Sequence, residues 1–517
     1  MLARCFVASL VAPVVSAANA IPVSRELAGQ SLVSSNAGNP PCAALEAAGL
    51  RDRLLVPTDA AYEPQINTWW AANTRLRPWC LVLPQTVDEV SLILKTLSNA
   101  GEGAGDWHIA IRSGSHSTTG GNNIVNGVAI DLSHMNSTEY DEASSLARVY
   151  TGARWESVYS HLAGVNRSVV GGRDGTVGVG GFLLGGGYSF YSPKLGFGCD
   201  SVVNYEVVLG NGTIVQANES AHSDLYRALK GGHSNFGLVT RFDMATIPAR
   251  NLWYELRYLA NNYSSVVADV AADFANHDES LGDNALVTWV SFNSTISPVT
   301  TASTIYVNVE GNPHVETSYD AIRRLPSLLS ESVSLPLTQA AAASGSGEGT
   351  WSTGSSGTYK NNPAILRNTI RVHEDLARNL TSAIGVDSFS TFFFMQPLPS
   401  YMGSIGKQRG GNVLGLDSLR DNAIIWTAGV SVSSNEADFA LARALLQEAS
   451  AQIQAFAASE DGVVDFIYLN YAGAEQDPLG SYGAEQVEFM RDVAARYDPA
   501  GVFQRRVPGG FKISRVV

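Results

Sequence analysis

Hydrophobic and polar positions in the first quarter of the chain follow the period of a helix and then that of a buried strand. Apolar residues from Val90 to Leu97 recur at the i, i+3, i+4 and i+7 spacing of one helix face, and Thr86-Val-Asp-Glu89 before them is a capping box. A glycine cluster at 101–105 ends the predicted helix, and the apolar run 107–111 predicts a strand. We therefore expect a strand-helix-strand unit that leads into a glycine turn.

The next part of the chain alternates strands with short helices. Two apolar runs, 202–209 and 213–217, flank Gly210-Asn211-Gly212 and give a strong hairpin signal. The further strand candidates are 127–132, 146–151 and 238–244, and the helix candidates are 155–162 and 223–229. Residues 42–245 are therefore predicted to form one α+β domain in two lobes.

Beyond Pro248 the composition changes, and longer helices alternate with strands. The strand candidates are 252–259, 285–292, 303–310, 389–396 and 423–432, and the clearest helices are 263–277, 372–384 and 436–459. This pattern predicts a second domain, at 250–460, in which one sheet is backed by helices. The Ser/Gly/Ala-rich segment 340–357 is predicted to be a mobile loop.

The C-terminal part, 465–517, is predicted to return to the first domain. Its first residues, 465–473, read Asp-Phe-Ile-Tyr-Leu-Asn-Tyr-Ala-Gly and predict a strand that leads to a turn. An amphipathic helix is predicted at 485–497, and Asp498-Pro499 stops it.

Length and charge narrow the functional classes. A chain of 517 residues exceeds what one hydrophobic core usually serves, so at least two domains are expected. With 34 basic against 48 acidic side chains the net charge is -14, and the basic clusters that nucleic acid binding requires are missing. No stretch after the first twenty residues approaches the roughly 20 apolar residues of a membrane span. We therefore expect a monomer that binds neither nucleic acid nor membrane, and we assign no metal site.

The first twenty residues have the features of a secretory signal peptide. One early arginine precedes the short apolar run 6–15, and Ala18-Asn-Ala20 has the small-x-small spacing of a cleavage site. We therefore expect a secreted protein or one of the secretory lumen, where Cys42 and Cys80 are the pair expected to form a disulfide, and Cys199 a buried thiol. The seven Asn-x-Ser/Thr sequons, candidate glycosylation sites, are Asn136, Asn166, Asn211, Asn218, Asn262, Asn293 and Asn379.

Two glycine-rich stretches carry the clearest chemical signal. Ile111-Arg-Ser-Gly-Ser-His-Ser117 is the end of a strand that breaks into small residues, a turn that can offer backbone N–H groups to an anion. Gly171–Gly187 has nine glycines in 17 residues, so its backbone is expected to pass close to a large flat group. No strict Gly-x-Gly-x-x-Gly fits it, which disfavours a Rossmann NAD site. The two stretches together predict a nucleotide cofactor.

These stretches, followed by Gly231-Gly-His-Ser-Asn-Phe-Gly-Leu-Val-Thr240, resemble FAD enzymes of the vanillyl-alcohol-oxidase (PCMH) type, in particular the fungal berberine-bridge-enzyme-like branch. The resemblance covers 42–243 and 465–503. It implies a two-lobed FAD-binding domain and a substrate domain whose antiparallel sheet covers the flavin. It also implies a single covalent bond between His116 and the flavin 8α-methyl group, for which a neutral imidazole is a competent nucleophile.

The resemblance also carries over a set of cofactor-binding residues. They are Arg112, Ser113, Gly114, Ser115, His116, Ser117, Asp174, Thr176, Val177, Gly178, Gly180, Gly181, Gly232, Val239, Asn470 and Tyr471. Asp174 stands where many relatives carry a cysteine bonded to flavin C6, so a second covalent link is excluded there, although Asp174 is equally compatible with a solvated loop carboxylate. Val177 is expected over the oxygen-reactive face, where a small side chain favours an oxidase.

The expected function is an FAD-dependent oxidase of a small organic substrate, a secondary-metabolite alcohol or related intermediate whose oxidation can be followed by cyclisation. Tyr471 would act as the base while hydride passes to flavin N5, and O2 would reoxidise the flavin with release of H2O2. A packed strand tyrosine is an equal interpretation of Tyr471. Gln396, Tyr401 and Trp426 are candidates for the substrate wall. The alternatives are an oligosaccharide oxidase, a dehydrogenase and a secreted flavin-binding protein without turnover.

Overall fold

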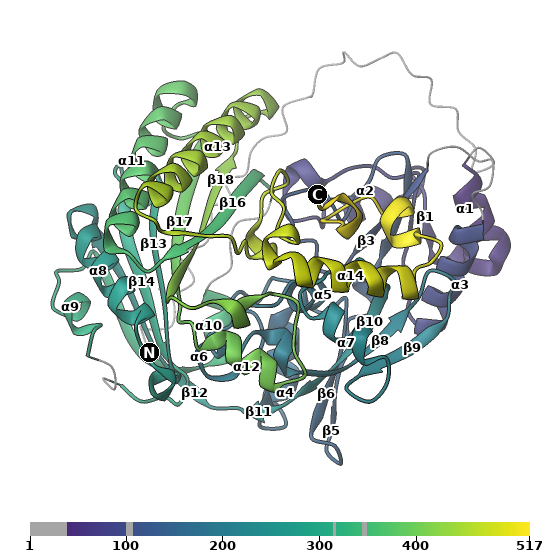
Figure 1. The fold of residues 1–517 in the computed structure, drawn as a ribbon. Helices are drawn as coiled ribbons and strands as arrows, with labels where there is room; N and C mark the ends of the chain where they lie inside the picture. Colours follow the sequence, from purple (N-terminus) through teal and green to yellow (C-terminus); the bar gives the residue numbers. More distant parts are fainter. Residues whose placement is uncertain (1–38, 100–106, 314–316, 344–348) are drawn as a thin grey trace.

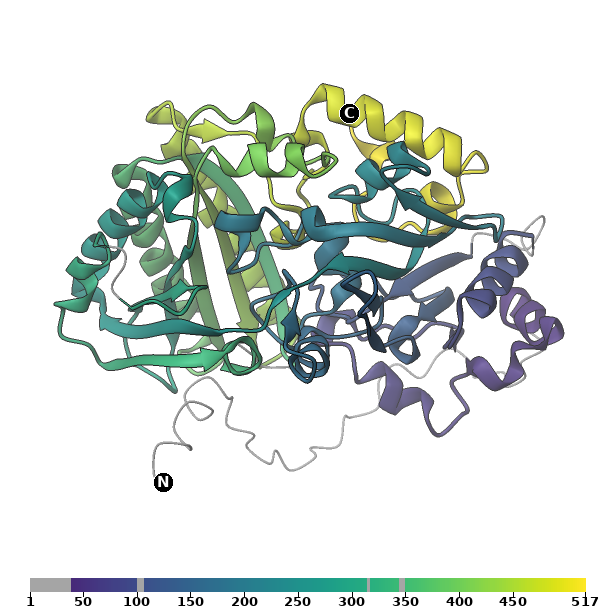
Figure 2. The ribbon, with the colours of Figure 1, turned by 90° about the horizontal axis from the view of Figure 1, so that it is seen from below.

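The structure is a computed structural model that describes residues 39–99, 107–313, 317–343 and 349–517. The predicted signal peptide lies outside the described residues. The elements form two parts that lie side by side, a two-lobed part built from the first half of the chain and an eight-stranded sheet backed by helices (Figures 1 and 2). The fold class is α+β, as the sequence predicted.

The first lobe is a small sheet, and the first glycine loop directly follows one of its strands, β3 (His108–Arg112). Its strand order is β1 (Leu54–Leu55), β2 (Cys80–Val82), β4 (Gly127–Asp131) and β3 (His108–Arg112), flanked by helices α1 (Pro40–Leu45), α2 (Tyr62–Ile66) and α3 (Val87–Asn99). Strand β4 runs parallel to both β2 and β3. The apolar face of α3 is buried as its spacing predicted, so this helix fixes the strands below it.

The second lobe is an antiparallel sheet with the second glycine loop packed on it. Its strand order is β5 (Thr138–Asp141), β6 (Leu146–Tyr150), β10 (Leu238–Ala245), β8 (Val202–Val208) and β9 (Ile214–Asn218), accompanied by α4 (Trp155–Ala163), α5 (Val179–Leu184), α6 (Ser192–Leu195) and α7 (Ser223–Leu229). Strands β7 (Arg167–Ser168) and β11 (Ile247–Pro248) form a separate pair. The predicted hairpin is confirmed, with Gly212 at φ +86° in its turn.

The third sheet is antiparallel throughout. Its strand order is β15 (Leu329–Pro336), β12 (Asn251–Ala260), β14 (Thr301–Asn308), β13 (Asn284–Asn293), β17 (Phe389–Leu398), β18 (Ala423–Val432), β16 (Trp351–Lys360) and β19 (Val463–Val464). The helices of this part are α8 (Ser264–Ala275), α9 (Asp320–Arg323), α10 (Leu337–Ala343), α11 (Pro363–Ile384), α12 (Met402–Gln408) and α13 (Glu436–Ser459). Helices α8, α11 and α13 cover one face of the sheet, and the two-lobed part lies against the other (Figure 2).

Two sequence predictions were wrong in this region. Of the segment 340–357, predicted as a mobile loop, residues 344–348 lie outside the described residues. The described residues belong to the end of α10 and to most of β16, a strand paired along its whole length with β18. Its small residues have a packing reason, because a Cβ on Gly357 would lie 2.8 Å from the indole nitrogen of Trp426. The predicted strand at 465–473 is instead an irregular segment with one short 3₁₀ turn at Leu469–Tyr471.

The C-terminal segment is fixed to the two-lobed part by buried hydrogen bonds. The hydroxyl of Tyr468 accepts from the backbone N–H groups of Gly187 and Tyr188 at 2.9 and 2.7 Å, and Asn470 donates its side-chain amide to the Phe182 carbonyl at 2.9 Å. Further along, helix α14 (Ala484–Tyr497) packs against α7. These bonds hold the residues that follow Tyr468 over the end of the second glycine loop.

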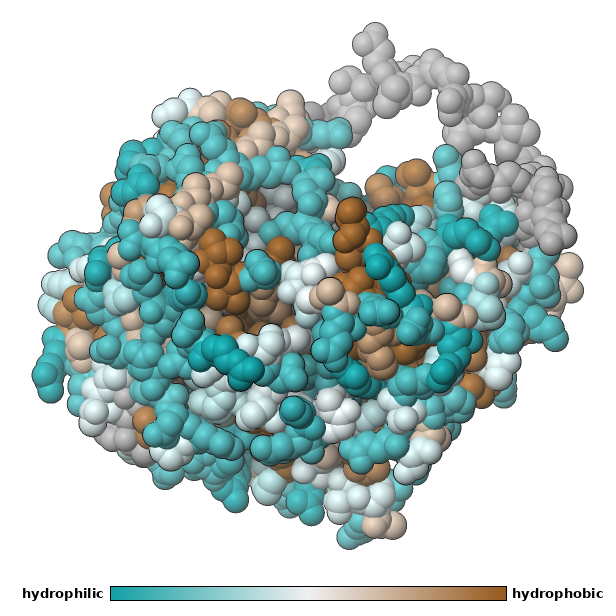
Figure 3. All heavy atoms as spheres, viewed as in Figure 1, coloured by the Kyte–Doolittle hydropathy of each residue, from teal (hydrophilic) through white to brown (hydrophobic). Residues whose placement is uncertain are grey.

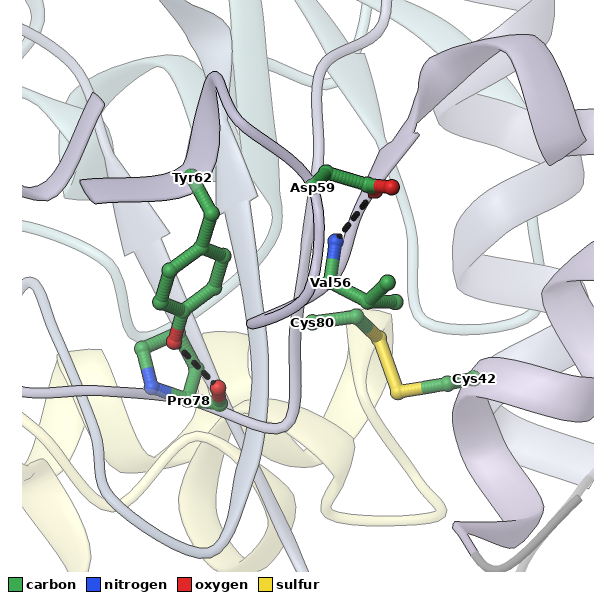
Figure 4. The surroundings of a disulfide bond; sticks show 6 residues. All are labelled: Cys42, Val56, Asp59, Tyr62, Pro78 and Cys80. Carbon is green, nitrogen blue, oxygen red and sulfur yellow. Dashed lines mark hydrogen bonds between the residues drawn. A yellow bond between two sulfur atoms is a disulfide. The ribbon is translucent and has the colours of Figure 1, made fainter. Parts of the chain in front are cut away.

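The predicted disulfide between Cys42 and Cys80 is present and ties α1 to strand β2 of the small sheet (Figure 4), with the two Cα atoms 6.2 Å apart. Cys199 is fully buried and burial raises the pKa of its thiol, in agreement with an unreactive small residue.

Replacing both disulfide cysteines, Cys42→Ala and Cys80→Ala, is expected to lower the free energy of unfolding by about 4 kcal/mol, because the bond closes a long loop in the unfolded chain. Denaturant unfolding followed by tryptophan fluorescence measures this loss, and the double variant should become insensitive to reductant. The control Cys199→Ala should keep the wild-type response to reductant. Unchanged unfolding of the double variant would contradict the expected role of the bond.

Candidate functional site

The two glycine loops touch each other backbone to backbone. A Cβ on Gly178 would lie 2.4 Å from the Cα of Gly114, a distance that no real side chain can occupy. Beside this contact the Ser113 hydroxyl donates to the Thr151 carbonyl at 2.5 Å and accepts from the Gly180 N–H at 3.2 Å. The loops are therefore one rigid unit, and the positions of the side chains that they carry are linked.

In the first loop, two of the predicted cofactor residues turn toward the protein. Arg112 is buried, pairs with Asp131 at 2.8 Å and lies over the Trp69 ring at 3.8 Å. Ser115 adopts φ +60°, and its hydroxyl donates to the carbonyl of Thr68 at 3.1 Å. The hydroxyl of Ser115 thus fixes the turn.

His116 stands where the two loops meet. Its ring stacks on Trp70 with the centroids 4.6 Å apart, and its Nε2 lies 3.9 Å from the Asp174 carboxylate. The other carboxylate oxygen of Asp174 accepts from the backbone N–H and the hydroxyl of Thr176 at 2.8 and 2.6 Å. Asp174 is therefore a turn-forming loop carboxylate that also faces His116. The two interpretations that the sequence allowed, a loop carboxylate and a residue of the cofactor site, are compatible with each other.

Most glycines of the second loop are required by neighbouring protein groups. Added Cβ atoms on Gly171 and Gly172 would meet the Trp155 ring, and one on Gly185 would meet Asn470. Gly181 differs, because it is exposed on helix α5 and a Cβ there would have no atom of the described residues within 4 Å. An exposed glycine between buried Val179 and Leu183 leaves open space against the backbone, as an extended flat cofactor requires.

The other predicted cofactor residues divide into core and surface positions. Val239 is buried in the pairing of β10 with β8, and a Cβ on Gly232 would meet the Ala228 carbonyl at 2.4 Å. Val177 is half-buried, while the Ser117 hydroxyl bonds to that of Thr119 at 2.9 Å. The packing of Val239 and Gly232 is thus explained without a cofactor, and their contact with the cofactor remains a prediction.

Beside the second loop, Arg154 is a cation that the sequence analysis missed. Its guanidinium donates to the Thr176 carbonyl, and both residues line a cavity of about 390 Å³ together with Thr68 and Glu156. A cation, backbone N–H groups and open space beside glycines suit a ligand that carries a pyrophosphate. The residues present therefore fit FAD, with the two loops, Thr176 and Arg154 as the groups that would hold it.

Tyr471 is brought to the second loop by the C-terminal segment. Its hydroxyl accepts a hydrogen bond from Arg173 at 2.6 Å and donates to Oε1 of Gln396 at 3.4 Å. Arg173 directly precedes Asp174, whereas Gln396 lies on β17 in the third sheet. The three residues thus connect the first part of the chain, the sheet and the C-terminal segment at one place. The sequence alone did not single out Arg173.

Two tyrosines near Tyr471, Tyr188 and Tyr468, are buried and use their hydroxyls in hydrogen bonds to the backbone. Tyr188 donates to the Pro397 carbonyl at 2.6 Å, and burial raises its pKa. Burial also raises the pKa of Tyr468, whose hydroxyl accepts two backbone bonds. Tyr471 is only half-buried, and its oxygen faces a guanidinium. Of the three, Tyr471 is the one placed to exchange a proton with a ligand.

The three residues predicted to line the substrate site, Gln396, Tyr401 and Trp426, lie in different places in the structure. Gln396 contacts Tyr471, but Trp426 is buried on the opposite face of the sheet, within the core formed with α11 and α13. The prediction that Trp426 lines the substrate site was therefore wrong, because strand alternation turns it toward the helices. Tyr401 lies beside Tyr188 and donates to the Pro193 carbonyl at 3.0 Å.

Within the described ranges, no helix is both long enough and apolar enough to cross a bilayer. The same part of the chain contains no group of three or more His, Cys, Asp or Glu side chains placed to hold a metal ion.

Comparisons with known proteins agree with this architecture. Residues 78–218 match the family described as FAD binding domain. The FAD-dependent monooxygenase sdcF of Emericella nidulans is 35% identical over 92% of this chain and 98% of its own length.

Solved structures share the fold at lower identity. The xylooligosaccharide oxidase of Myceliophthora thermophila superposes with a TM-score of 0.73 at 18% identity, over 90% of this chain and 98% of that one. The glucooligosaccharide oxidase of Acremonium strictum, described as carrying a 6-S-cysteinyl, 8α-N1-histidyl FAD, gives a TM-score of 0.70 at 18% identity, over 92% and 99% of the two chains.

Gly181→Ala and Gly178→Ala are expected to separate cofactor contact from loop packing. Gly181→Ala should leave the unfolding midpoint unchanged or raise it, since alanine favours a helix by up to about 1 kcal/mol, while the flavin bound per protein should fall severalfold. Gly178→Ala should lower both, because its Cβ would strike the first loop. Thermal unfolding and the ratio of flavin to protein absorbance measure the two effects. Full flavin content in Gly181→Ala would contradict a cofactor at this helix.

Proposed function

The chain belongs to the FAD-dependent oxidoreductases of the vanillyl-alcohol-oxidase type with berberine-bridge-like members, and from this premise we propose that it oxidises an alcohol carbon of a small organic molecule with O2 as electron acceptor. The overall reaction converts the alcohol and O2 to a carbonyl compound and H2O2. The observation that supports this proposal is the position of Tyr471, whose oxygen lies between Arg173 and Gln396 at the junction of the glycine loops and the sheet.

In the proposed mechanism, Tyr471 acts as a phenolate, which takes the hydroxyl proton of the substrate and becomes the neutral phenol. The Arg173 guanidinium, which donates to the Tyr471 oxygen at 2.6 Å, stabilises the negative charge of the phenolate before the transfer. Gln396 holds the same oxygen from the sheet side. When bound, FAD supplies the acceptor for the hydrogen and electron pair of the C–H bond and passes the electrons to O2.

We further propose that His116 holds the cofactor covalently and that this is the single link. His116 is half-buried at the meeting point of the two loops, and the carboxylate of Asp174 near its Nε2 can orient the ring. The Acremonium strictum oxidase is described with both a histidyl and a cysteinyl link. In this chain Asp174 occupies the expected cysteine position, and Cys199 is buried in the core.

For the substrate, we propose a secondary-metabolite alcohol. The support is the 35% identity over almost the whole chain to a fungal FAD-dependent monooxygenase, against 18% to the oligosaccharide oxidases. The name of that relative also makes monooxygenation the second candidate reaction. Labelled ¹⁸O2 distinguishes the two, since an oxidase leaves the label in peroxide and a monooxygenase places one labelled atom in the product.

We also propose that the protein is secreted and glycosylated. The disulfide in the first lobe suits an oxidising compartment. Of the predicted acceptor asparagines, those exposed on the surface are Asn136, Asn166, Asn211, Asn262 and Asn379. Exposed sequons are accessible to glycosylation during secretion.

His116→Ala is expected to release the flavin. Acid precipitation of the wild-type protein should leave the yellow colour in the pellet, because a covalent bond survives unfolding, and the same treatment of His116→Ala should move it into the supernatant. Flavin absorbance of both fractions is the measurement. The exposed His161→Ala, on helix α4, is the matched control and should keep the wild-type distribution. Colour in the wild-type supernatant would refute the covalent link.

Tyr471→Phe is expected to lower kcat by about 100-fold or more, the usual contribution of a positioned base, with KM changed less than about threefold. The assay is peroxide release with the best alcohol from a substrate panel. Tyr401→Phe removes a hydroxyl bonded to a carbonyl away from Tyr471 and should retain activity. Equal kcat in Tyr471→Phe and the wild type would show that another group takes the proton.

A further inference from the structure

We propose that Arg173 and Gln396 bind an acidic oxygen of the substrate, and that the substrate is therefore a flat, mostly apolar molecule that carries a carboxylate, phenolate or enolate near the carbon to be oxidised. This inference rests on the proposed function, since it concerns the same site. Three features of the described residues lead to it.

The first feature is the charge of Arg173. Its guanidinium is half-buried and lies over the rings of Tyr188 and Phe190, at 5.2 and 6.0 Å from their centroids. In the described part of the chain no carboxylate lies within ion-pair distance of it, although buried or half-buried cations are usually paired. One of its five N–H donors goes to Tyr471. The remaining donors can bind an anionic oxygen in the same plane.

The second feature is the unused amide of Gln396. The side chain is 1% exposed, and its Nε2 has no hydrogen-bond partner among the described residues. Leaving a buried donor unsatisfied costs on the order of 1–3 kcal/mol, so such a group normally has a purpose. Its Oε1 is already in contact with Tyr471. The free N–H is thus held beside the same hydroxyl as Arg173.

The third feature is a row of aromatic rings on the same face of the sheet. Tyr258, Trp289, Phe394 and Phe392 follow one another on β12, β13 and β17, with centroid distances of 6.0, 5.6 and 4.9 Å. Phe394 is two residues from Gln396, so both point to the face opposite the helices. Phe392, at the end of the row, is 36% exposed. Hydrophobic residues also gather in a hollow between the two parts of the molecule (Figure 3).

The polar groups near this row favour an apolar ligand over a sugar. On the neighbouring strands, the hydroxyl of Ser356 donates to the Trp426 carbonyl at 2.8 Å, and that of Thr427 to the Ser355 carbonyl at 3.3 Å. These hydroxyls are used within the sheet, whereas a sugar needs several free polar partners. The row instead offers ring faces to a flat body whose acidic end reaches Arg173 and Gln396.

The test compares two probes with the same ring system, one with a charged carboxylate and one with that group neutralised as its methyl ester. Calorimetric titration of the purified holoenzyme with 2-naphthoate and with methyl 2-naphthoate gives the two dissociation constants. The wild type is expected to bind the anion at least about tenfold more tightly than the ester, the effect of one charge-assisted pair. Arg173→Gln should weaken naphthoate binding at least about tenfold and change ester binding less than twofold. Gln396→Leu should reduce the preference by a smaller factor.

Two controls make the result specific. Arg443→Gln removes an exposed guanidinium that pairs with Glu475 on the surface, and should keep the wild-type preference. Tyr471→Phe should also keep it, which separates anion binding from proton transfer. Equal binding of both probes by the wild type, or an unchanged preference in Arg173→Gln, would overturn the proposal.

Flavin content and peroxide release, measured on the same preparations, report on the proposed function separately. A protein that prefers naphthoate through Arg173 but lacks flavin or peroxide release would refute the proposed oxidase and support this binding site. A flavoprotein that releases peroxide but does not prefer naphthoate would support the proposed oxidase and refute this binding site.

Discussion

The contact between Gly114 and Gly178 is the constraint on which the site depends. Two loops from different lobes approach until only glycine fits at both positions, and the Ser113 hydroxyl bridges them to the strand below. Because the loops cannot move apart independently, His116 is held facing Asp174. The same constraint fixes the backbone of Arg173, which directly precedes Asp174. A backbone contact of this kind positions side chains more firmly than surface ion pairs, whose net contribution is small.

The C-terminal segment completes the site by a second set of buried bonds. Tyr468 accepts hydrogen bonds from the backbone N–H groups at the end of the second loop, and Asn470 donates to the Phe182 carbonyl, so the backbone that leads to Tyr471 is fixed. Gln476 adds two bonds to the backbone of Ser356 on β16. The segment thus joins the loops to the sheet, and the proton transfer and substrate binding that we propose would occur at this junction.

The shared fold leaves the chemistry of the substrate open, since the superposed structures include oligosaccharide oxidases at 18% identity. Function is determined by the side chains placed on a common scaffold. In this chain the side chains that we propose to select the substrate are a half-buried arginine without a carboxylate partner in the described residues, a buried glutamine amide and a row of aromatic rings. Their combination distinguishes this site from one built only of sugar-binding hydroxyls and amides.

The sequence by itself determined the elements with clear periodicity and the loops with unusual composition. Helix α13 was predicted at the bounds that the structure shows, strands β13, β17 and β18 were located, and the disulfide was paired correctly. Local patterns suffice there because helix and strand periods are encoded within a few turns of chain.

Only the tertiary structure decided which side chains meet. Strand β16 escaped prediction because its glycines and serines show no apolar alternation, and one of them, Gly357, makes room for Trp426. The face to which Trp426 points depends on strand register, and Arg173 meets Tyr471 across 298 positions of sequence. Such contacts follow from the packing of distant segments, and no local pattern of hydrophobic and polar residues records them.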